Sequence, residues 1–161
     1  MLFSEYQRFQ YARSPLVEVI CQLRFPAILT INTKEPAEFQ EAVRHDFPRY
    51  AVRQEQRPPK LVGAGTPNAK LEPQSPVANH SFISADGFWK LNLTKDFIAL
   101  STLRYTRWED FALRLDKPLA QFIQVYEPAF FERIGLRYVN AVSKSRLGLT
   151  DLLWDDLIRS P

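Results

Sequence analysis

Three short runs of alternating apolar and polar residues, separated by two turn signals, occupy the middle of the chain. The runs read HSFISA, FWKLNLT and FIALSTLRYT. Asp86-Gly87 separates the first two, and this dipeptide is typical of a tight hairpin turn because glycine readily adopts the positive φ that the turn needs. Lys95-Asp96 separates the second and third runs and is a weaker signal, although the alternation continues on both sides of it. Strands joined by hairpins pair antiparallel, so the sequence predicts an antiparallel meander over residues 81–105.

Further segments are predicted to add strands to this meander. Between residues 16 and 25 every odd position is apolar, whereas Glu18, Gln22 and Arg24 occupy even positions. This period of two predicts a long, half-buried strand. The segment FFERIGLRYVNAVS predicts another strand of about ten residues, and RYAVRQE is compatible with a short one.

Helical spacing of apolar residues appears in three places: residues 36–47, 108–126 and 150–159. Pro118 lies inside the second, so we expect a kink there or two shorter helices. Hairpin-linked strands together with separate helices predict the fold class. We expect an α+β fold, with a mainly antiparallel sheet of about five strands and two or three helices packed on one face.

The chain is predicted to form one domain preceded by an arm. Its 161 residues are 45% hydrophobic, which is enough for a single core and too apolar for disorder. Residues 1–15 form an arm rich in aromatic side chains, and residues 16–161 form the α+β domain. Residues 57–79 hold five of the 12 prolines and two of the five glycines with almost no periodicity, so we expect a long, proline-rich surface loop.

Cysteine content, charge and hydropathy limit the compartments in which this protein is expected and the classes of partner that it is expected to bind. Cys21 is the only cysteine, which excludes an internal disulfide framework and suits a reducing compartment. The N-terminus lacks a basic start followed by an apolar block, and no apolar run is long enough to cross a bilayer. We therefore expect a cytoplasmic protein without a membrane partner. The net charge is +3, with a local basic excess in residues 43–60 that permits weak binding of nucleic acid.

Two stretches together resemble a known family. SPLVEVICQLRFP (residues 14–26) and IGLRYVN (residues 134–140) are similar to the paired motifs of a sporadically distributed family of uncharacterised bacterial proteins. Its members open on a PLVEV strand that ends in LRF, and carry a GLRYxN strand after a helix. The resemblance implies a bacterial cytoplasmic protein with no established activity. Members continue into a further sheet-rich segment, so the resemblance is compatible with this chain being the N-terminal part of a longer protein.

Charged residues on the predicted strands give the candidate site. If these strands are neighbours, Arg24, Arg104 and Arg137 converge on one sheet face beneath the helices, with Glu18 and Asn140 as polar support. Several guanidinium groups facing one way match a carboxylate or a phosphate. The alternative is structural: Glu18 bridges an arginine across strands, and the arginine stems cover the sheet. Both interpretations stay open at this point.

Nothing in the sequence argues for an enzyme, a metal or a cofactor. Neither His45 nor His80 has neighbours with metal-ligand spacing, and Cys21 lies among apolar residues, as a buried small side chain does. The stretch GAGTPNAK lacks the Gly-Lys-Ser/Thr ending of a phosphate-binding loop. We expect no catalytic residue, no metal site and no cofactor.

Three functions remain as hypotheses. The first is a non-catalytic protein-interaction or scaffold module, with a protein partner or self-association through the aromatic arm, the proline-rich loop or the last helix. The second is binding of a small anionic ligand on the sheet face. The third is binding of nucleic acid.

Overall fold

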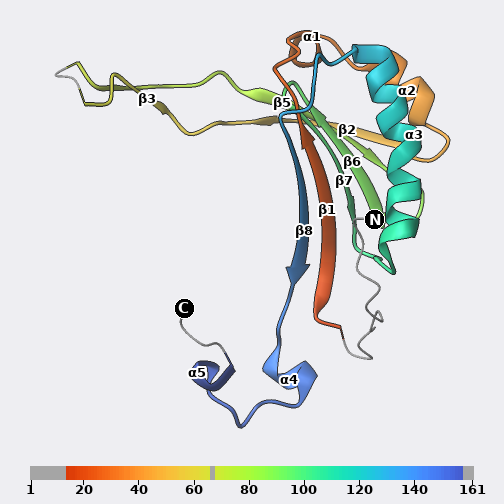
Figure 1. Cartoon of the computed structure of the whole chain (residues 1–161), viewed down its shortest axis with the longest axis vertical. Helices are drawn as coiled ribbons and strands as arrows, with labels where there is room; N and C mark the ends of the chain where they lie inside the picture. The colour runs from red at the N-terminus through yellow and green to blue at the C-terminus, as the bar shows by residue number, and fades with distance from the viewer. Residues whose placement is uncertain (1–13, 66–67, 158–161) are drawn as a thin grey trace, which may run out of the picture.

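The computed structural model describes residues 14–65 and 68–157 and confirms the α+β class. Six strands form an antiparallel sheet in the order β2-β5-β6-β7-β1-β8 (Figure 1). Their bounds are Leu16–Arg24 for β1, Arg49–Glu55 for β2, Val77–Ile83 for β5, Trp89–Thr94 for β6, Phe97–Thr102 for β7 and Arg133–Asn140 for β8. Beyond the expected five, the sixth strand is β2, the short RYAVRQE segment, which pairs with β5 along its whole length.

The predicted meander is β5-β6-β7, and side chains close both of its turns. Gly87 has a φ of 76°, the conformation for which glycine is suited, in the turn between β5 and β6. In the turn between β6 and β7, Thr94 Oγ1 donates to Asp96 Oδ1 at 3.0 Å. These local contacts fix the register, so that Leu91 pairs with Phe82 on one side and with Leu100 on the other.

Three helices pack on one face of the sheet (Figure 1). They are α1 (Thr30–Thr33), α2 (Ala37–Val43) and α3 (Trp108–Tyr126). The apolar residues of the strands and the apolar stripes of α2 and α3 meet in one core. Fully buried members include Val19, Phe39, Phe82, Leu91, Leu100, Phe111 and Phe122. The period-two and helical patterns therefore converge on a single buried layer.

The helix α3 is continuous through Pro118, so the predicted division into two helices is wrong. Proline removes one backbone donor, but the ring of Pro118 is buried in the packing of this helix. Burial of that apolar surface offsets the missing hydrogen bond.

Residues 57–79 are not a structureless loop, which corrects the prediction. Lys60–Val62 (β3) and Lys70–Glu72 (β4) pair as a two-stranded hairpin that projects from the sheet (Figure 1). Both strands are exposed along their length, so no buried face imposes an alternating pattern on the sequence. Prolines flank the short strands where pairing stops.

The predicted helix over residues 150–159 is wrong at its start, because residues 150–153 are not helical, and its last two residues lie outside the described residues. The chain after β8 forms two single-turn helices, α4 (Lys144–Leu147) and α5 (Trp154–Leu157), and Trp154 is exposed. An isolated short helix gains stability mainly by burying an apolar face, and the described residues offer this segment little to pack against. The predicted arm falls largely on residues 1–13, outside the described residues.

Candidate anion-binding face

Among the described residues, no helix covers the face of the sheet opposite α1, α2 and α3, and we call it the open face. Successive residues of a strand point to opposite faces. On β1 the core takes the residues Val19, Cys21 and Leu23, so the open face receives Glu18, Ile20, Gln22 and Arg24. The register extends this pattern: Gln22 pairs with Ala99 on β7 and with Gly135 on β8.

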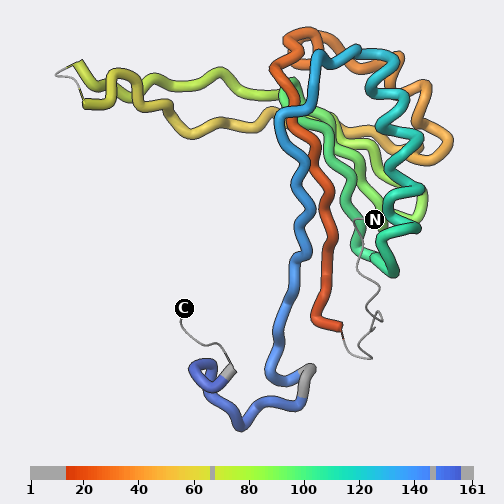
Figure 2. Tube along the Cα trace, viewed as in Figure 1, coloured from red at the N-terminus to blue at the C-terminus, as the bar shows by residue number. Residues whose placement is uncertain are grey.

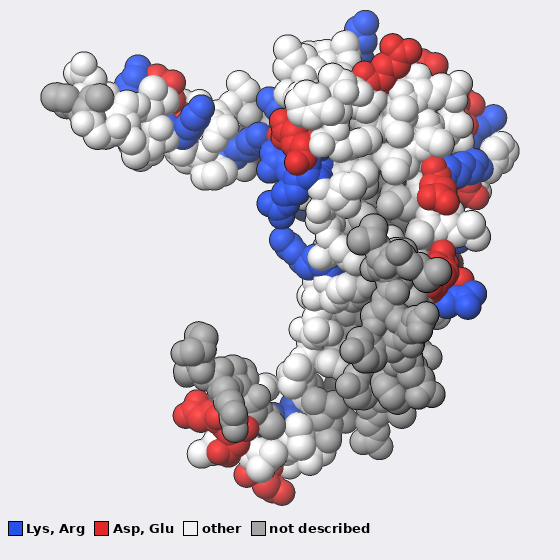
Figure 3. All heavy atoms as spheres, in the orientation of Figure 1, with Lys and Arg blue, Asp and Glu red and all other residues white. Residues whose placement is uncertain are grey.

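The open face lies on the concave side of the molecule. The β3–β4 hairpin and the segment after β8 both project away from the helices, to the same side of the sheet (Figure 2). Lys and Arg side chains gather on this concave side, next to the base of the hairpin (Figure 3). The projecting segments thus flank a basic surface.

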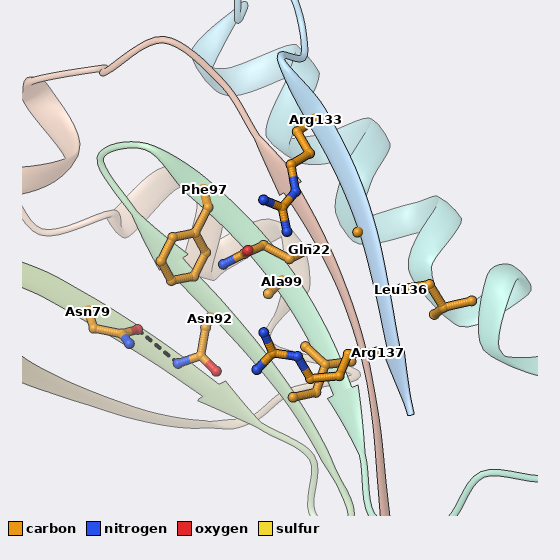
Figure 4. Close-up of a pocket in the computed structure, with 10 residues that line it drawn as sticks. Gln22, Asn79, Asn92, Phe97, Ala99, Arg133, Leu136 and Arg137 are labelled. Carbon is orange, nitrogen blue, oxygen red and sulfur yellow. Dashed lines mark hydrogen bonds between the residues drawn. The ribbon is translucent and has the colours of Figure 1, made fainter. Parts of the chain in front are cut away.

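A shallow depression of ≈ 280 Å³ lies in the middle of the open face. The polar and aromatic side chains that line it come from five strands: Gln22, Asn79, Asn92, Phe97, Arg133 and Arg137. Figure 4 shows Arg133 and Arg137 leaving β8 toward the strands that carry Gln22 and Ala99, whereas Leu136 points to the other side of β8. The β8 strand therefore supplies cations to one face and apolar groups to the other.

Gly135 lies between the two arginines on β8 and allows the guanidinium of Arg133 to lie close to the backbone of the sheet. A Cβ atom at this position would lie 3.7 Å from Arg133 Nη2 and 3.8 Å from Arg133 Nε. The guanidinium of Arg133 therefore lies over the bare backbone of Gly135. The φ of this glycine is not positive, so open space, rather than an unusual backbone conformation, is what glycine provides here.

The two guanidinium groups have no ion-pair partner within residues 14–65 and 68–157. Both side chains are exposed. Each guanidinium carries five donors in a planar fork that matches a carboxylate or a phosphate. These donors are available to a ligand.

Amide groups beside the arginines are held in a fixed chain. Asn92 Nδ2 donates to Asn79 Oδ1 at 2.8 Å and to Ser81 Oγ at 2.9 Å, and Asn79 Nδ2 donates to Glu55 Oε1 at 2.6 Å. These bonds use both hydrogens of Asn92 and leave its Oδ1 as a free acceptor. The side-chain amide of Gln22 makes no hydrogen bond to any described residue. The depression therefore offers both donors and acceptors.

Arg24 lies at the edge of this site, but its charge is shared. Its Nη2 lies 3.7 Å from Asp96 Oδ2, which also accepts from Arg57 Nη2 at 2.5 Å. Burial alone would raise the pKa of Asp96. Hydrogen bonds from Arg57 and Thr94, with the charges of Arg57 and Arg24, outweigh that effect and lower the pKa below its ordinary value. Arg24 therefore partly serves a structural ion pair.

The other predicted site residues do not join the depression. Arg104 lies beyond the end of β7, where its guanidinium carbon stands 3.7 Å from the centre of the Phe88 ring. Asn140 is at the far end of β8, paired with Leu16. Glu18 is on the open face, but it makes no ion pair within the described part of the chain. The expected position beneath the helices is wrong as well, because the helix-covered face is the apolar core.

Sequence reasoning missed Arg133, Gln22, Asn92 and Phe97. Arg133 and Arg137 are four positions apart on β8, so both side chains point to the same face of the sheet. Strand alternation alone was therefore enough to predict that Arg133 joins Arg137. The positions of Asn92 and Phe97 relative to β8 required the strand order, which places β7 and β1 between Asn92 and β8, and β1 between Phe97 and β8. That order depends on pairing between segments far apart in the sequence.

The histidine and cysteine on the other face have structural surroundings. His80 is 3% exposed, with Nε2 2.9 Å from the Ile31 carbonyl oxygen and Nδ1 2.8 Å from the Tyr50 hydroxyl. The carbonyl can only accept, so Nε2 carries the proton and Nδ1 accepts from Tyr50. Burial raises the pKa of the Cys21 thiol, which opposes the thiolate that nucleophilic chemistry needs.

Among the described residues, no group of three or more potential ligands is placed to hold a metal ion. In the same part of the chain, none of the helices combines the length and apolarity that crossing a bilayer requires. Comparison with protein-family models, with curated proteins and with solved structures gives no match to this chain.

Proposed function

We propose that this chain is a non-catalytic binding module that holds an anionic ligand on its open face. The observation that carries the proposal is the pair of guanidinium groups of Arg133 and Arg137, which have no ion-pair partner among the described residues and converge over the depression. A free carbonyl oxygen on Asn92 and the amide of Gln22 lie beside them. This combination fits a ligand that carries negative charge together with polar groups.

The chemistry of the depression favours binding over catalysis. Its side chains are guanidinium, amide, aromatic and aliphatic groups. None of these exchanges a proton readily near neutral pH, and none is a strong nucleophile. Cys21 is the single cysteine of the sequence, which suits a reducing compartment, and we propose that the module is cytoplasmic.

A thermal-shift screen with organic anions, nucleotides and inorganic phosphate tests the proposal. A ligand that binds the folded state raises the melting temperature. We expect such a shift for the unmodified chain, and a smaller shift for Arg133→Ala and Arg137→Ala. Arg44→Ala is the charge control, because it removes one arginine, which pairs with Glu41, from the C-cap of α2 on the helical side. The proposal fails if no anion changes the melting temperature, or if Arg137→Ala responds like the control.

Protein contact through β8 is a second candidate, favoured by the exposed edge of the sheet. In the described part of the chain, β8 pairs only with β1, so its other edge is open. Its apolar side chains on the helical side stay exposed: Ile134 67%, Leu136 43% and Tyr138 45%. An open edge can accept a further strand. Because β8 alternates cations with apolar groups, the complementary partner is a strand that alternates acidic and apolar residues.

A synthetic peptide that alternates Glu and Val tests this second candidate by calorimetry. We expect it to bind, and Ile134→Lys to weaken the binding because Ile134 loses its apolar contact. The same peptide with every backbone amide N-methylated has no donor left on either edge and should not bind. Equal binding of both peptides would exclude strand addition.

A further inference from the structure

The basic surface extends well beyond the depression. Five basic side chains on the open face are exposed and have no ion pair within the described residues: Arg49 and Arg53 on β2, Lys90 on β6, and Arg133 and Arg137 on β8. Glu18 is the only acidic side chain on this face without a polar partner among those residues, since Glu55 accepts from Asn79 and Asp96 is paired with arginines. The open face therefore carries a net positive charge from one edge of the sheet to the other.

The spread of this charge exceeds the size of a single anionic group. Arg53 pairs with Asn79, and Arg133 pairs with Arg24, so the two arginines end the same row of residues across the sheet. Five inter-strand steps separate β2 from β8, which corresponds to about 24 Å. One phosphate or carboxylate reaches only one end of such a row. A ligand that uses both ends carries several negative charges along its length.

The shape of the site also favours an extended ligand. The depression holds ≈ 280 Å³, just below the roughly 300 Å³ at which pockets that enclose a small molecule begin. Its floor is the sheet itself, with Ala99 and Gly135 providing no bulk above the backbone. A strand-like molecule can lie across this floor without needing to be enclosed.

Phe97 adds a feature that a simple polyanion does not need. Its ring lies on the open face among Gln22, Asn92 and Arg133 (Figure 4) and is only half-buried. It makes no ring contact with another aromatic side chain in the described residues, whereas Phe25, Phe82 and Phe122 all do. An accessible ring between cations is a stacking platform for a nucleobase. Asn92 Oδ1 and the side-chain amide of Gln22 line the same depression as Phe97, and such groups can bond the edge of a base.

We propose that the open face binds single-stranded nucleic acid, with phosphates on Arg133 and Arg137 and a base stacked on Phe97. This inference rests on the proposed anion-binding function and names its ligand class. A duplex keeps its bases stacked inside, so Phe97 has no role in binding it. Inorganic polyphosphate has no base at all.

Fluorescence anisotropy with labelled oligothymidine and oligouridine tests this inference. We expect both single strands to bind at low salt, and the affinity to fall with salt by a slope that decreases by about 0.7 for each arginine replaced by alanine. Phe97→Leu should weaken the binding of single strands about tenfold. The affinity of the same variant for polyphosphate should be unchanged. Phe97→Tyr keeps the ring and should bind normally. Arg44→Ala again serves as the control for charge.

The outcomes separate the two proposals. If polyphosphate binds but Phe97→Leu leaves oligonucleotide affinity unchanged, the nucleic-acid inference fails and anion binding stands. Preference for a duplex over a single strand of equal length also overturns the inference. If no anion of any kind binds, both proposals fail. Circular dichroism melting of each variant shows whether a loss of affinity reflects unfolding. If Phe97→Leu does unfold, Phe97→Tyr tests the inference instead, and weak binding by this folded variant would count against stacking.

Discussion

Arg57, at the base of the projecting hairpin, donates a hydrogen bond from Nη2 to Oδ2 of Asp96 with 2.5 Å between the two atoms. Asp96 is 8% exposed and belongs to the turn between β6 and β7. Arg24 of β1 approaches the same oxygen at 3.7 Å. One carboxylate therefore ties together three segments that are distant in the sequence.

Replacement of Asp96 by Asn should destabilise the fold in a pH-dependent way. The pKa of this carboxyl is lowered in the folded state from an ordinary value of 3.8. A lowered pKa stabilises the fold at pH values above 3.8, and this contribution is lost as the pH falls through the folded value. We expect Asp96→Asn to reduce the free energy of unfolding by about 1–3 kcal/mol at neutral pH. Urea denaturation above and below pH 3.8 measures the difference, which should shrink on the acidic side; a constant difference contradicts the prediction.

Replacing a phenylalanine of the aromatic core by alanine should lower the free energy of unfolding far more than replacing an exposed phenylalanine. The Phe25 and Phe122 ring centres lie 4.7 Å apart, and both rings are buried. We expect Phe122→Ala to lower the free energy of unfolding by about 3–5 kcal/mol, because it leaves a cavity. Phe130 is 60% exposed, and Phe130→Ala should change stability by only about 0.5 kcal/mol. Chemical denaturation of the two variants compares them directly, and similar losses would argue against the packing described.

The hydrogen bonds of His80 predict one tautomer. Its proton should be on Nε2, where the Ile31 carbonyl accepts it, and Tyr50 should donate to Nδ1. Nitrogen-15 NMR of the imidazole distinguishes the two nitrogens. Tyr50→Phe removes the donor and should cost about 1 kcal/mol of stability. A proton found on Nδ1 would contradict this assignment, because Nδ1 would then donate to the Tyr50 hydroxyl.

Substitutions at Gly135 should separate binding from folding. The Cβ of an alanine would make ordinary contacts with the Arg133 guanidinium, so Gly135→Ala should fold and bind nearly as the unmodified chain does. A larger side chain occupies the place where Arg133 lies. We expect Gly135→Leu to keep its melting temperature within a few degrees and to weaken anion binding about tenfold, the loss of one charge-assisted contact. Calorimetry of both variants tests this, and equal affinities would remove Gly135 from the site.

Local patterns in the sequence predicted most of the sheet. The alternation over residues 16–25 and in the meander reported which side chains are buried, because each strand packs one face against helices. The same alternation placed Arg137 and Leu136 on opposite faces. The β3–β4 hairpin gave no such signal, since Leu61 and Leu71 are both exposed and no buried face selects their neighbours. The resemblance to the family with PLVEV and GLRYxN motifs stays a prediction.

The candidate site was harder to predict because it depends on the order of the strands. Arg24 and Arg137 do reach the same face, since β1 and β8 are neighbours. Arg104 does not, because β7 ends at Thr102 and the chain then turns toward α3. A cluster of arginines beneath the helices would have required burying several charges, and the cost of that desolvation keeps the charged side of each strand facing water.

The positions of Arg133 and Arg137 around Gly135 also bear on the solubility of the chain. If two molecules met edge to edge along β8, antiparallel and centred on Gly135, Arg133 of each would stand opposite Arg137 of the other. Like charges placed directly across such a ladder repel each other. The two positive charges therefore oppose edge-to-edge pairing of β8 between molecules. A bound anion that neutralises them would remove this opposition.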